Sequence, residues 1–191
     1  GSGPVTLPDQ DGAYTLQVVG ADAVGNERTS GGVRVTLDRQ APSVEASSPT
    51  VWCSKPCPVS VHASDAVTGL RSITVSAAGS PETVAQPTGE GDRTWSIDAS
   101  TLGLEGEVSL HVTVADGAGN VRAVDVPVKI DTQAPAISGP TADPLTRTVA
   151  VDVAETSGVA SATVRIGRRS VDLLPAGPSQ SGIQTLSASI P

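Results

Sequence analysis

One passage of this chain occurs twice. The two copies share a first glycine and a final Ala-Pro, and they read GAYTLQVVGADAVGNERTSGGVRVTLDRQAP at residues 12–42 and GEVSLHVTVADGAGNVRAVDVPVKIDTQAP at residues 106–135. The offset is 94 residues from Asp22 to Asp116 and 93 residues from Asp38 to Asp131, so the second copy lacks one residue between these anchors. A period of this length is that of a small β-sandwich, and it indicates one folding unit used more than once.

Apolar and polar residues alternate along both copies. In the second copy the apolar positions are Val108, Leu110, Val112 and Val114, then Val126, Val128 and Ile130 after a turn. The first copy has Tyr14, Leu16 and Val18, then Val33, Val35 and Leu37. A period of two predicts half-buried strands, so each copy is expected to form a β-hairpin.

A second pattern precedes the second hairpin and then recurs. Its apolar positions are Val59, Val61 and Ala63, then Ile73 and Val75, and they return at Val149, Val151 and Val153, then Ala162 and Val164. Trp95 and Ile97 mark a further strand before the second hairpin. One unit, residues 41–133, therefore holds at least five strands in an order suited to an immunoglobulin-like sandwich.

Composition agrees with an all-β fold. The chain has 20 Gly and 15 Pro but no Phe or Met, so turns are frequent and aliphatic side chains, valine above all, must fill the interior. The expected fold class is all-β, with tandem immunoglobulin-like β-sandwiches of which one is complete and two are partial.

The phase of the repeat predicts where the units divide. Residues 1–40 match only the last part of a sandwich, and residues 134–191 match only the first part, so the chain begins and ends within a domain. One interpretation is a segment of a longer array. The other is that the two halves pair between molecules, which completes a sandwich by β-augmentation and covers its open edges.

The charge excludes two classes of partner. A net charge of -8 and a pI near 4.6 argue against nucleic acid and anionic membrane surfaces, which require clustered Lys and Arg. Apolar runs of about 18 to 20 residues, which membrane insertion requires, are absent from the sequence, and so is a signal-peptide pattern.

The passage DGAYTLQVVGADAVGN with LDRQAP, repeated as VTVADGAGN with IDTQAP, resembles the bacterial immunoglobulin-like repeats of large surface and secreted proteins. The resemblance implies an extracellular or cell-surface rod, used as a stalk or adhesin and sometimes stiffened by calcium. Its partners would be neighbouring repeats or copies of itself. The second copy departs from the first with Val108 in place of Tyr14, and the two cysteines lie outside the usual pattern.

Several residues have an expected structural role. Tyr14 starts a strand two residues before a core position, where a tyrosine corner would bind its hydroxyl to nearby backbone. The Asp-x-x-Gly-Asn elements are expected to be turns, because Gly and Asn tolerate positive φ and Asp caps local backbone groups. Their members are Asp22, Gly25 and Asn26 in the first copy, and Asp116, Gly119 and Asn120 in the second.

The same acidic turns have a second interpretation, which is calcium binding. In an immunoglobulin-like sandwich the turns at Asp65 and Asp116 lie at the pole that faces the preceding domain, which Asp38 closes. These three carboxylates could meet at the first junction and supply the hard oxygen ligands that calcium requires. Asp131 and Glu155 would be the equivalents at the second junction, where the partner turn is missing. The alternative is solvated turns without an ion.

Cys53 and Cys57 lie just ahead of the strand that begins at Val59. In an exported protein this pair is expected to form a small-loop disulfide. Free thiols and a zinc site are the alternatives. Zinc would need further ligands, and His62 and His111 are expected on outward strand faces.

We find no catalytic motif, and we expect a non-catalytic structural or adhesive rod segment that acts as a stalk or spacer. Ala-Pro linkers limit bending between its modules. Two alternatives remain: a subunit of a surface filament completed by strand exchange between chains, and a module that binds a surface glycan or receptor. A sugar platform would need exposed aromatic rings; Tyr14 is expected to be buried, which leaves Trp52 and Trp95.

Overall fold

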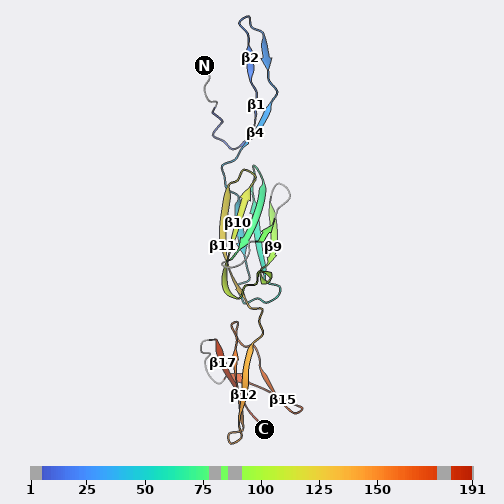
Figure 1. Cartoon of the computed structure of the whole chain (residues 1–191), viewed down its shortest axis with the longest axis vertical. Coiled ribbons are helices and arrows are strands. Elements are labelled where there is room, and N and C mark those ends of the chain that lie inside the picture. The colour runs from blue at the N-terminus through green and yellow to red at the C-terminus, as the bar shows by residue number, and fades with distance from the viewer. Residues whose placement is uncertain (1–5, 78–82, 86–91, 176–181, 191) are drawn as a thin grey trace.

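The computed structural model of the chain describes residues 6–77, 83–85, 92–175 and 182–190. Within these residues the fold is all-β, as expected, with a single turn of 3-10 helix at η1 (Ala99–Leu102). Three parts follow one another along the long axis of the molecule: an N-terminal hairpin, a central two-sheet sandwich and a smaller C-terminal part (Figure 1). None of the helical segments described has the length and apolar character needed to cross a membrane.

The central sandwich consists of two antiparallel sheets. One sheet has the order β5 (Ser43–Ser47), β6 (Pro58–Ser64) and β9 (Arg93–Asp98). The other has the order β11 (Val121–Ile130), β10 (Gly106–Asp116), β7 (Leu70–Ser76) and β8 (Thr83–Ala85). The chain changes sheet between β6 and β7, and again between β8 and β10, which is the connection pattern of immunoglobulin-like sandwiches. The alternation identified five of these strands and missed β5 and β8, which are only five and three residues long.

The core lies between these two sheets and is aliphatic. One face of each strand supplies it, because side chains alternate across the pleat. Its fully buried large side chains include Val59, Val61, Ile73, Val75, Leu110, Val112, Val114, Val128 and Ile130. Each such side chain contributes about 1.5 to 3 kcal/mol when it leaves water, so the alternation that marks the strands also stabilises the sandwich.

The N-terminal part is one long hairpin in two segments. β1 (Gly12–Leu16) pairs with β4 (Val33–Leu37), and β2 (Val19–Ala21) pairs with β3 (Glu27–Thr29). Its register repeats that of β10 and β11: Leu16 lies opposite Val33 as Leu110 lies opposite Val126. The pairs of β2 and β3 match at an offset of 94 on both strands, whereas β4 matches β11 at 93. The extra residue of the first copy therefore lies in residues 30–32.

The alternation predicted a half-buried face on this hairpin, and this expectation was wrong. Leu16, Val18 and Val33 are 39%, 71% and 62% exposed, whereas Leu110 and Val112 in the second copy are fully buried. The strand pattern is the same in both copies, but only β10 and β11 have a second sheet packed against them. Period-two alternation specifies which face is apolar, while the opposing sheet decides whether that face is buried.

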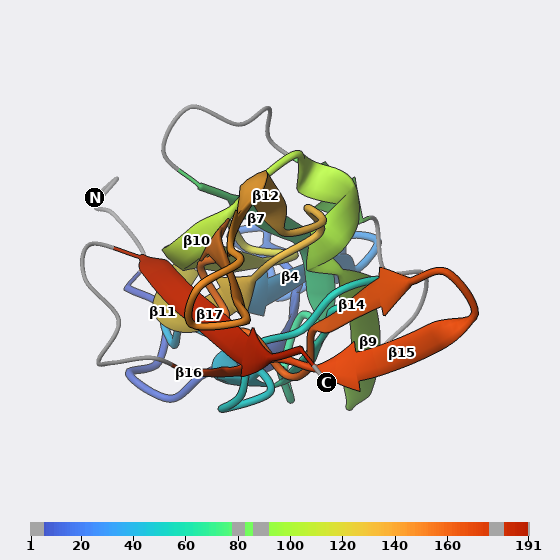
Figure 2. The same cartoon turned by 90° about the horizontal axis from the view of Figure 1, so that it is seen from below.

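The C-terminal part has a four-stranded sheet and a separate hairpin. The sheet has the order β12 (Ala136–Asp143), β13 (Thr148–Ala154), β17 (Ile183–Ser189) and β16 (Leu174–Pro175). The hairpin consists of β14 (Thr163–Ile166) and β15 (Arg169–Asp172), and β15 and β17 lie on different sides of this part (Figure 2). A small core joins them, made of Val149, Val151, Val153, Leu173 and Leu186. The division of the chain at residues 40 and 133 into one complete and two partial domains stays a prediction.

Candidate functional site: an acidic junction

Three carboxylates meet where the N-terminal hairpin joins the central sandwich. Asp38 directly follows β4, Asp65 directly follows β6, and Asp116 is the last residue of β10. One carboxylate oxygen of each lies within 4.8 Å of those of the other two. Asp116 is fully buried and Asp38 is only 8% exposed. The ends of β6 and β10 share one pole of the sandwich, and the linker after β4 brings Asp38 onto it.

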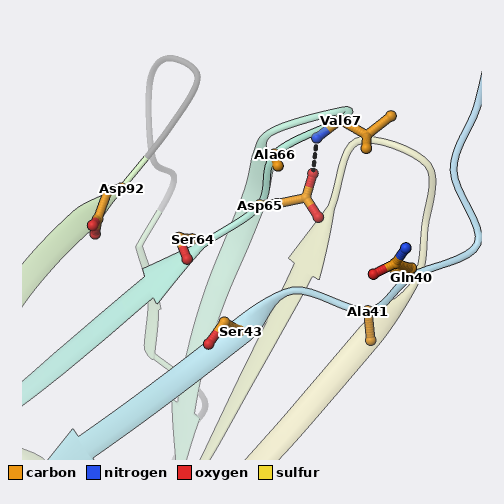
Figure 3. Close-up of a pocket in the computed structure, with 8 residues that line it drawn as sticks. All are labelled: Gln40, Ala41, Ser43, Ser64, Asp65, Ala66, Val67 and Asp92. Atoms are coloured by element: carbon orange, nitrogen blue, oxygen red, sulfur yellow. Dashed lines mark hydrogen bonds between the residues drawn. The ribbon is translucent and has the colours of Figure 1, made fainter. Parts of the chain in front are cut away.

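Asp65 organises the turn between β6 and β7. Its Oδ1 accepts hydrogen bonds from the backbone N–H groups of Val67, Thr68 and Gly69 at 3.1, 2.9 and 2.9 Å. Figure 3 shows Asp65 beside a hollow of about 490 Å³, with Gln40 of the linker on one side and Asp92 farther away. All three backbone bonds end on one oxygen, so the turn remains fixed while Oδ2 is directed to other contacts.

Asp116 has the same function in the turn between β10 and β11. Its Oδ1 accepts from the N–H groups of Gly119 and Asn120 at 2.7 and 2.8 Å, and its Oδ2 accepts from Asn120 Nδ2 at 2.8 Å. Gly119 has φ 98°, a left-handed conformation that favours glycine. The Asp-x-x-Gly-Asn element is therefore a side-chain-capped turn.

The turn of the N-terminal hairpin repeats this geometry in an exposed position. Asp22 Oδ1 accepts from the N–H groups of Val24 and Asn26 at 3.0 and 2.9 Å, and Asp22 Oδ2 accepts from Asn26 Nδ2 at 2.7 Å. The Asn26 side chain, followed by its backbone N–H, holds the pKa of Asp22 below its ordinary value of 3.8. Gly25 has φ 93°. The turn forms without any neighbouring domain, so its geometry comes from its own sequence.

Hydrogen bonds tie the linker to both turns of the central sandwich. Thr68 Oγ1 donates to Asp38 Oδ2 at 2.5 Å, and Asn120 Nδ2 donates to the backbone carbonyl of Asp38 at 3.2 Å. The turns also contact each other, because Gly117 N–H donates to Gly69 O at 3.0 Å. A Cβ on Gly117 would lie 2.8 Å from the carbonyl oxygen of Thr68, so only glycine permits this approach. Sequence reasoning missed Thr68 and Gly117.

The electrostatics of the cluster favour a cation. At 4.8 Å and an effective dielectric constant near 20, two carboxylates repel by about 3.5 kcal/mol. None of the ion pairs found among the described residues involves Asp38, Asp65 or Asp116. The donors are all oxygens, as calcium prefers, with no thiolate or imidazole. The three residues therefore fit a divalent cation, which would neutralise their charge and draw the linker and both turns together.

The second junction brings together the equivalent residues without the third turn. Asp131 follows β11 and Glu155 follows β13, and both line a hollow of about 460 Å³ with Glu105. The pKa of Asp131 lies below its ordinary value of 3.8, first because of a hydrogen bond with the Ser157 side chain and next because of Glu155. Sequence reasoning missed Glu105 and Ser157. The offset of 94 from Asp11 to Glu105 would have identified the former.

The cysteines form a disulfide at the opposite pole of the sandwich. Cys53 and Cys57 are bonded, with 5.3 Å between their Cα atoms. Cys53 N–H donates to the carbonyl of Lys129 at 2.9 Å, and Asp131 N–H donates to the carbonyl of Cys53 at 2.9 Å. The disulfide therefore fixes the segment before β6 against the end of β11, next to the second junction. Lys129 Nζ also lies 5.8 Å from the centre of the Trp52 ring.

The remaining predicted residues lie apart from the acidic cluster. The Tyr14 hydroxyl donates to the backbone carbonyl of Gln10 at 2.5 Å, and the ring is half-buried, not buried as expected. His62 Nε2 lies 3.1 Å from Asp92, and His111 Nδ1 lies 2.8 Å from Asp125. Within the described residues, the acidic junction is the one group of three or more metal-binding side chains.

Comparison with known proteins gave matches among solved structures. No family model matches the chain, and no curated protein matches it. The chain is similar to a calcium-stabilised adhesin that helps an Antarctic bacterium reach out and bind ice, with 20% identity and a TM-score of 0.32 over 94% of this chain and 49% of that one. It is also similar to part of a 1.5-MDa bacterial ice-binding adhesin described for host cell surface retention, with 18% identity and a TM-score of 0.33 over 95% of this chain and 64% of that one. The chain thus spans less than two thirds of either structure.

Proposed function

We propose that this chain is a non-catalytic, structural or adhesive rod segment of tandem immunoglobulin-like repeats, which serves as a stalk or spacer at the cell surface. The observation that carries the proposal is the first junction. Asp38, in the linker, is nearly buried and hydrogen-bonded to the two turns at the pole of the next sandwich. A linker held in this way transmits orientation from one module to the next, which a stalk requires.

Two further features support this setting. A disulfide between Cys53 and Cys57 persists in the oxidising environment outside the cytosol, which agrees with an extracellular or cell-surface location. The titratable groups that cluster in the described residues do so in turns at the domain junctions and not with a nucleophile in an apolar cleft, which favours a structural role over catalysis.

We assign a cation to this function as its regulator. Asp38, Asp65 and Asp116 would hold a calcium ion, which supplies the positive charge that three neighbouring carboxylates lack. The alternative is a set of solvated turns that needs no ion. With the ion bound, the hairpin and the sandwich would move as one body; without it, repulsion between the carboxylates would loosen the linker.

Small-angle X-ray scattering tests the proposal directly. The maximum dimension and cross-section of the chain are measured in calcium and in EDTA, for the parent and for Asp38→Asn. We expect an extended, rigid particle in calcium and a broader distribution in EDTA, with the variant insensitive to either condition. Identical scattering curves from the parent in both conditions would remove the cation from the function, and a flexible chain in both would remove the rod.

A glycan-binding role has less support from the aromatic side chains. Trp95 packs against the core of the central sandwich, and Trp52 is half-buried beside Lys129. A sugar platform needs an open ring face for stacking. Glycan-array binding that is lost on Trp52→Ala would nevertheless establish this alternative.

A further inference from the structure

We propose that the β1–β4 hairpin of one copy docks into the open side of the C-terminal part of a second copy, which joins the chains head to tail. The inference deepens the rod function proposed above, because it names the partner that completes the unfinished sandwich. It rests on a template within the molecule: the β10–β11 hairpin occupies the equivalent place in the central sandwich.

The C-terminal part has an apolar groove where that hairpin would lie. Its volume is about 400 Å³, and its lining includes Ile137, Val149, Val151, Val153 and Val164. In the central sandwich the space over Val59 and Val61, the equivalents of Val149 and Val151 at an offset of 90, is closed, because both are fully buried. The groove is therefore the core of a sandwich that lacks two strands.

Val44 and Ile137 show how much cover is missing. They occupy equivalent positions at the start of β5 and β12, two residues after the Ala-Pro linkers. Val44 is 9% exposed because β11 packs alongside β5, whereas Ile137 is 68% exposed. An isoleucine with this exposure inside an apolar groove marks a surface that a partner covers.

The groove also has an open strand edge. In the central sandwich β7 pairs with β8 on one side and with β10 on the other. Among the described strands, β14 pairs only with β15. The free edge of β14 therefore offers backbone groups to one further antiparallel strand, as in β-augmentation.

The template fixes the register of the docked hairpin. Val112 of β10 lies opposite Val75 of β7, and Val114 lies opposite Ile73. Offsets of 94 for the hairpin and 89 for the groove strand turn the first pair into Val18 opposite Val164 of the second copy. Because side chains alternate across a strand, a slip of one residue would turn the apolar face of the hairpin outward.

The hairpin is preformed for this register. Its apolar face, made of Leu16, Val18 and Val33, is exposed, and its strands already have the pairing of β10 and β11. Its Asp22 turn has the hydrogen bonds of the Asp116 turn, so docking would direct Asn26 Nδ2 to the carbonyl of Asp131, as Asn120 Nδ2 contacts that of Asp38. Docking therefore requires little reordering of the donor, which lowers its entropic cost.

The occupant is a second copy because the hairpin cannot reach the groove of its own chain. The central sandwich lies between the two parts along the long axis (Figure 1). The groove accepts a two-stranded antiparallel hairpin with one apolar face and a capped Asp-x-x-Gly-Asn turn, and β1–β4 is such a hairpin.

The test uses sedimentation velocity of the whole chain over a wide concentration range, with three variants. Val18→Asp removes the donor face, Ile137→Asp removes the acceptor, and Leu145→Asp is the control, since Leu145 is 94% exposed and lies outside the groove. We expect the mass of the parent and the control to rise with concentration, while each blocked variant stays a monomer. A mixture of the two blocked variants retains one intact hairpin and one intact groove, and is expected to stop at a 1:1 dimer.

A cross-link checks the register. Val18→Cys mixed with Val164→Cys should form an intermolecular disulfide on mild oxidation, whereas Val18→Cys mixed with Leu145→Cys should not. A parent that stays monomeric at all concentrations overturns the proposal, and so does a Val164→Cys chain that cross-links to itself, since β14 would then pair edge to edge. All measurements are made in calcium and in EDTA. Assembly in EDTA without any effect of calcium on melting leaves docking intact and removes the cation, while a calcium-stabilised monomer has the opposite meaning.

Discussion

Neutralising one carboxylate at the first junction separates the charge of this cluster from its function as a turn. The Asp65→Asn variant keeps an Oδ1 that can accept the three backbone N–H groups of its turn. It replaces the other oxygen, near Asp38 and Asp116, with an uncharged NH₂ group. The variant thus alters the cation site while it preserves the local fold.

The structure sets the size of the expected effect. In EDTA, Asn removes repulsion of about 3.5 kcal/mol with each of two neighbours, and it weakens three charge-assisted hydrogen bonds by about 1 kcal/mol each. These opposing terms leave the variant as stable as the parent, or more stable. In calcium at 100 times its Kd, the parent gains about 2.7 kcal/mol, or about 10 to 20 °C for a sandwich of this size. The variant should lose most of that gain.

The assay is thermal unfolding followed by calorimetry, with a calcium titration after exhaustive chelation. The matched control is Asp143→Asn, since Asp143 also caps a turn, through the N–H of Leu145 at 2.8 Å, but lies outside the acidic cluster. A parent that melts at the same temperature in calcium and in EDTA would refute the reasoning. So would an Asp65→Asn variant with the full calcium response, because the carboxylate would then hold no ion.

Three further predictions concern the central sandwich. Replacing both Cys53 and Cys57 with alanine should lower its free energy of unfolding by about 2 kcal/mol, as expected for a loop this short, and reduction of the parent in a denaturant titration should reproduce the loss. Leu110→Ala should cost about 2 to 5 kcal/mol in the same titration, because Leu110 is fully buried between the sheets. The pKa of Asp98 lies below its ordinary value of 3.8, chiefly through the Ser100 hydroxyl, so its stabilisation is complete above about pH 4 and is lost as the pH falls further. Asp98→Asn should flatten that acid limb of the melting temperature, and an unchanged limb would show that another carboxylate produces it.

The candidate site could be predicted from the sequence to an unusual degree because its parts are local. Asp22 and Asp116 have the same capped turn although one is exposed and the other fully buried, so five residues suffice to form it. Thr68 could not be identified in this way. Its hydroxyl bonds to Asp38, 30 residues earlier, and only the packing of the linker on the pole creates that contact.

The sequence by itself determined the strands, their register and the face of each that is apolar, since alternation and turn chemistry act over a few residues. It also determined that the hairpin of residues 12–37 and that of residues 106–130 are two copies of one element. Only the tertiary structure decided that Val18 is 71% exposed while Val112 is fully buried. The physical reason is that burial depends on a second sheet from elsewhere in the chain, and one sheet of the central sandwich covers β10 while none covers β1 or β2.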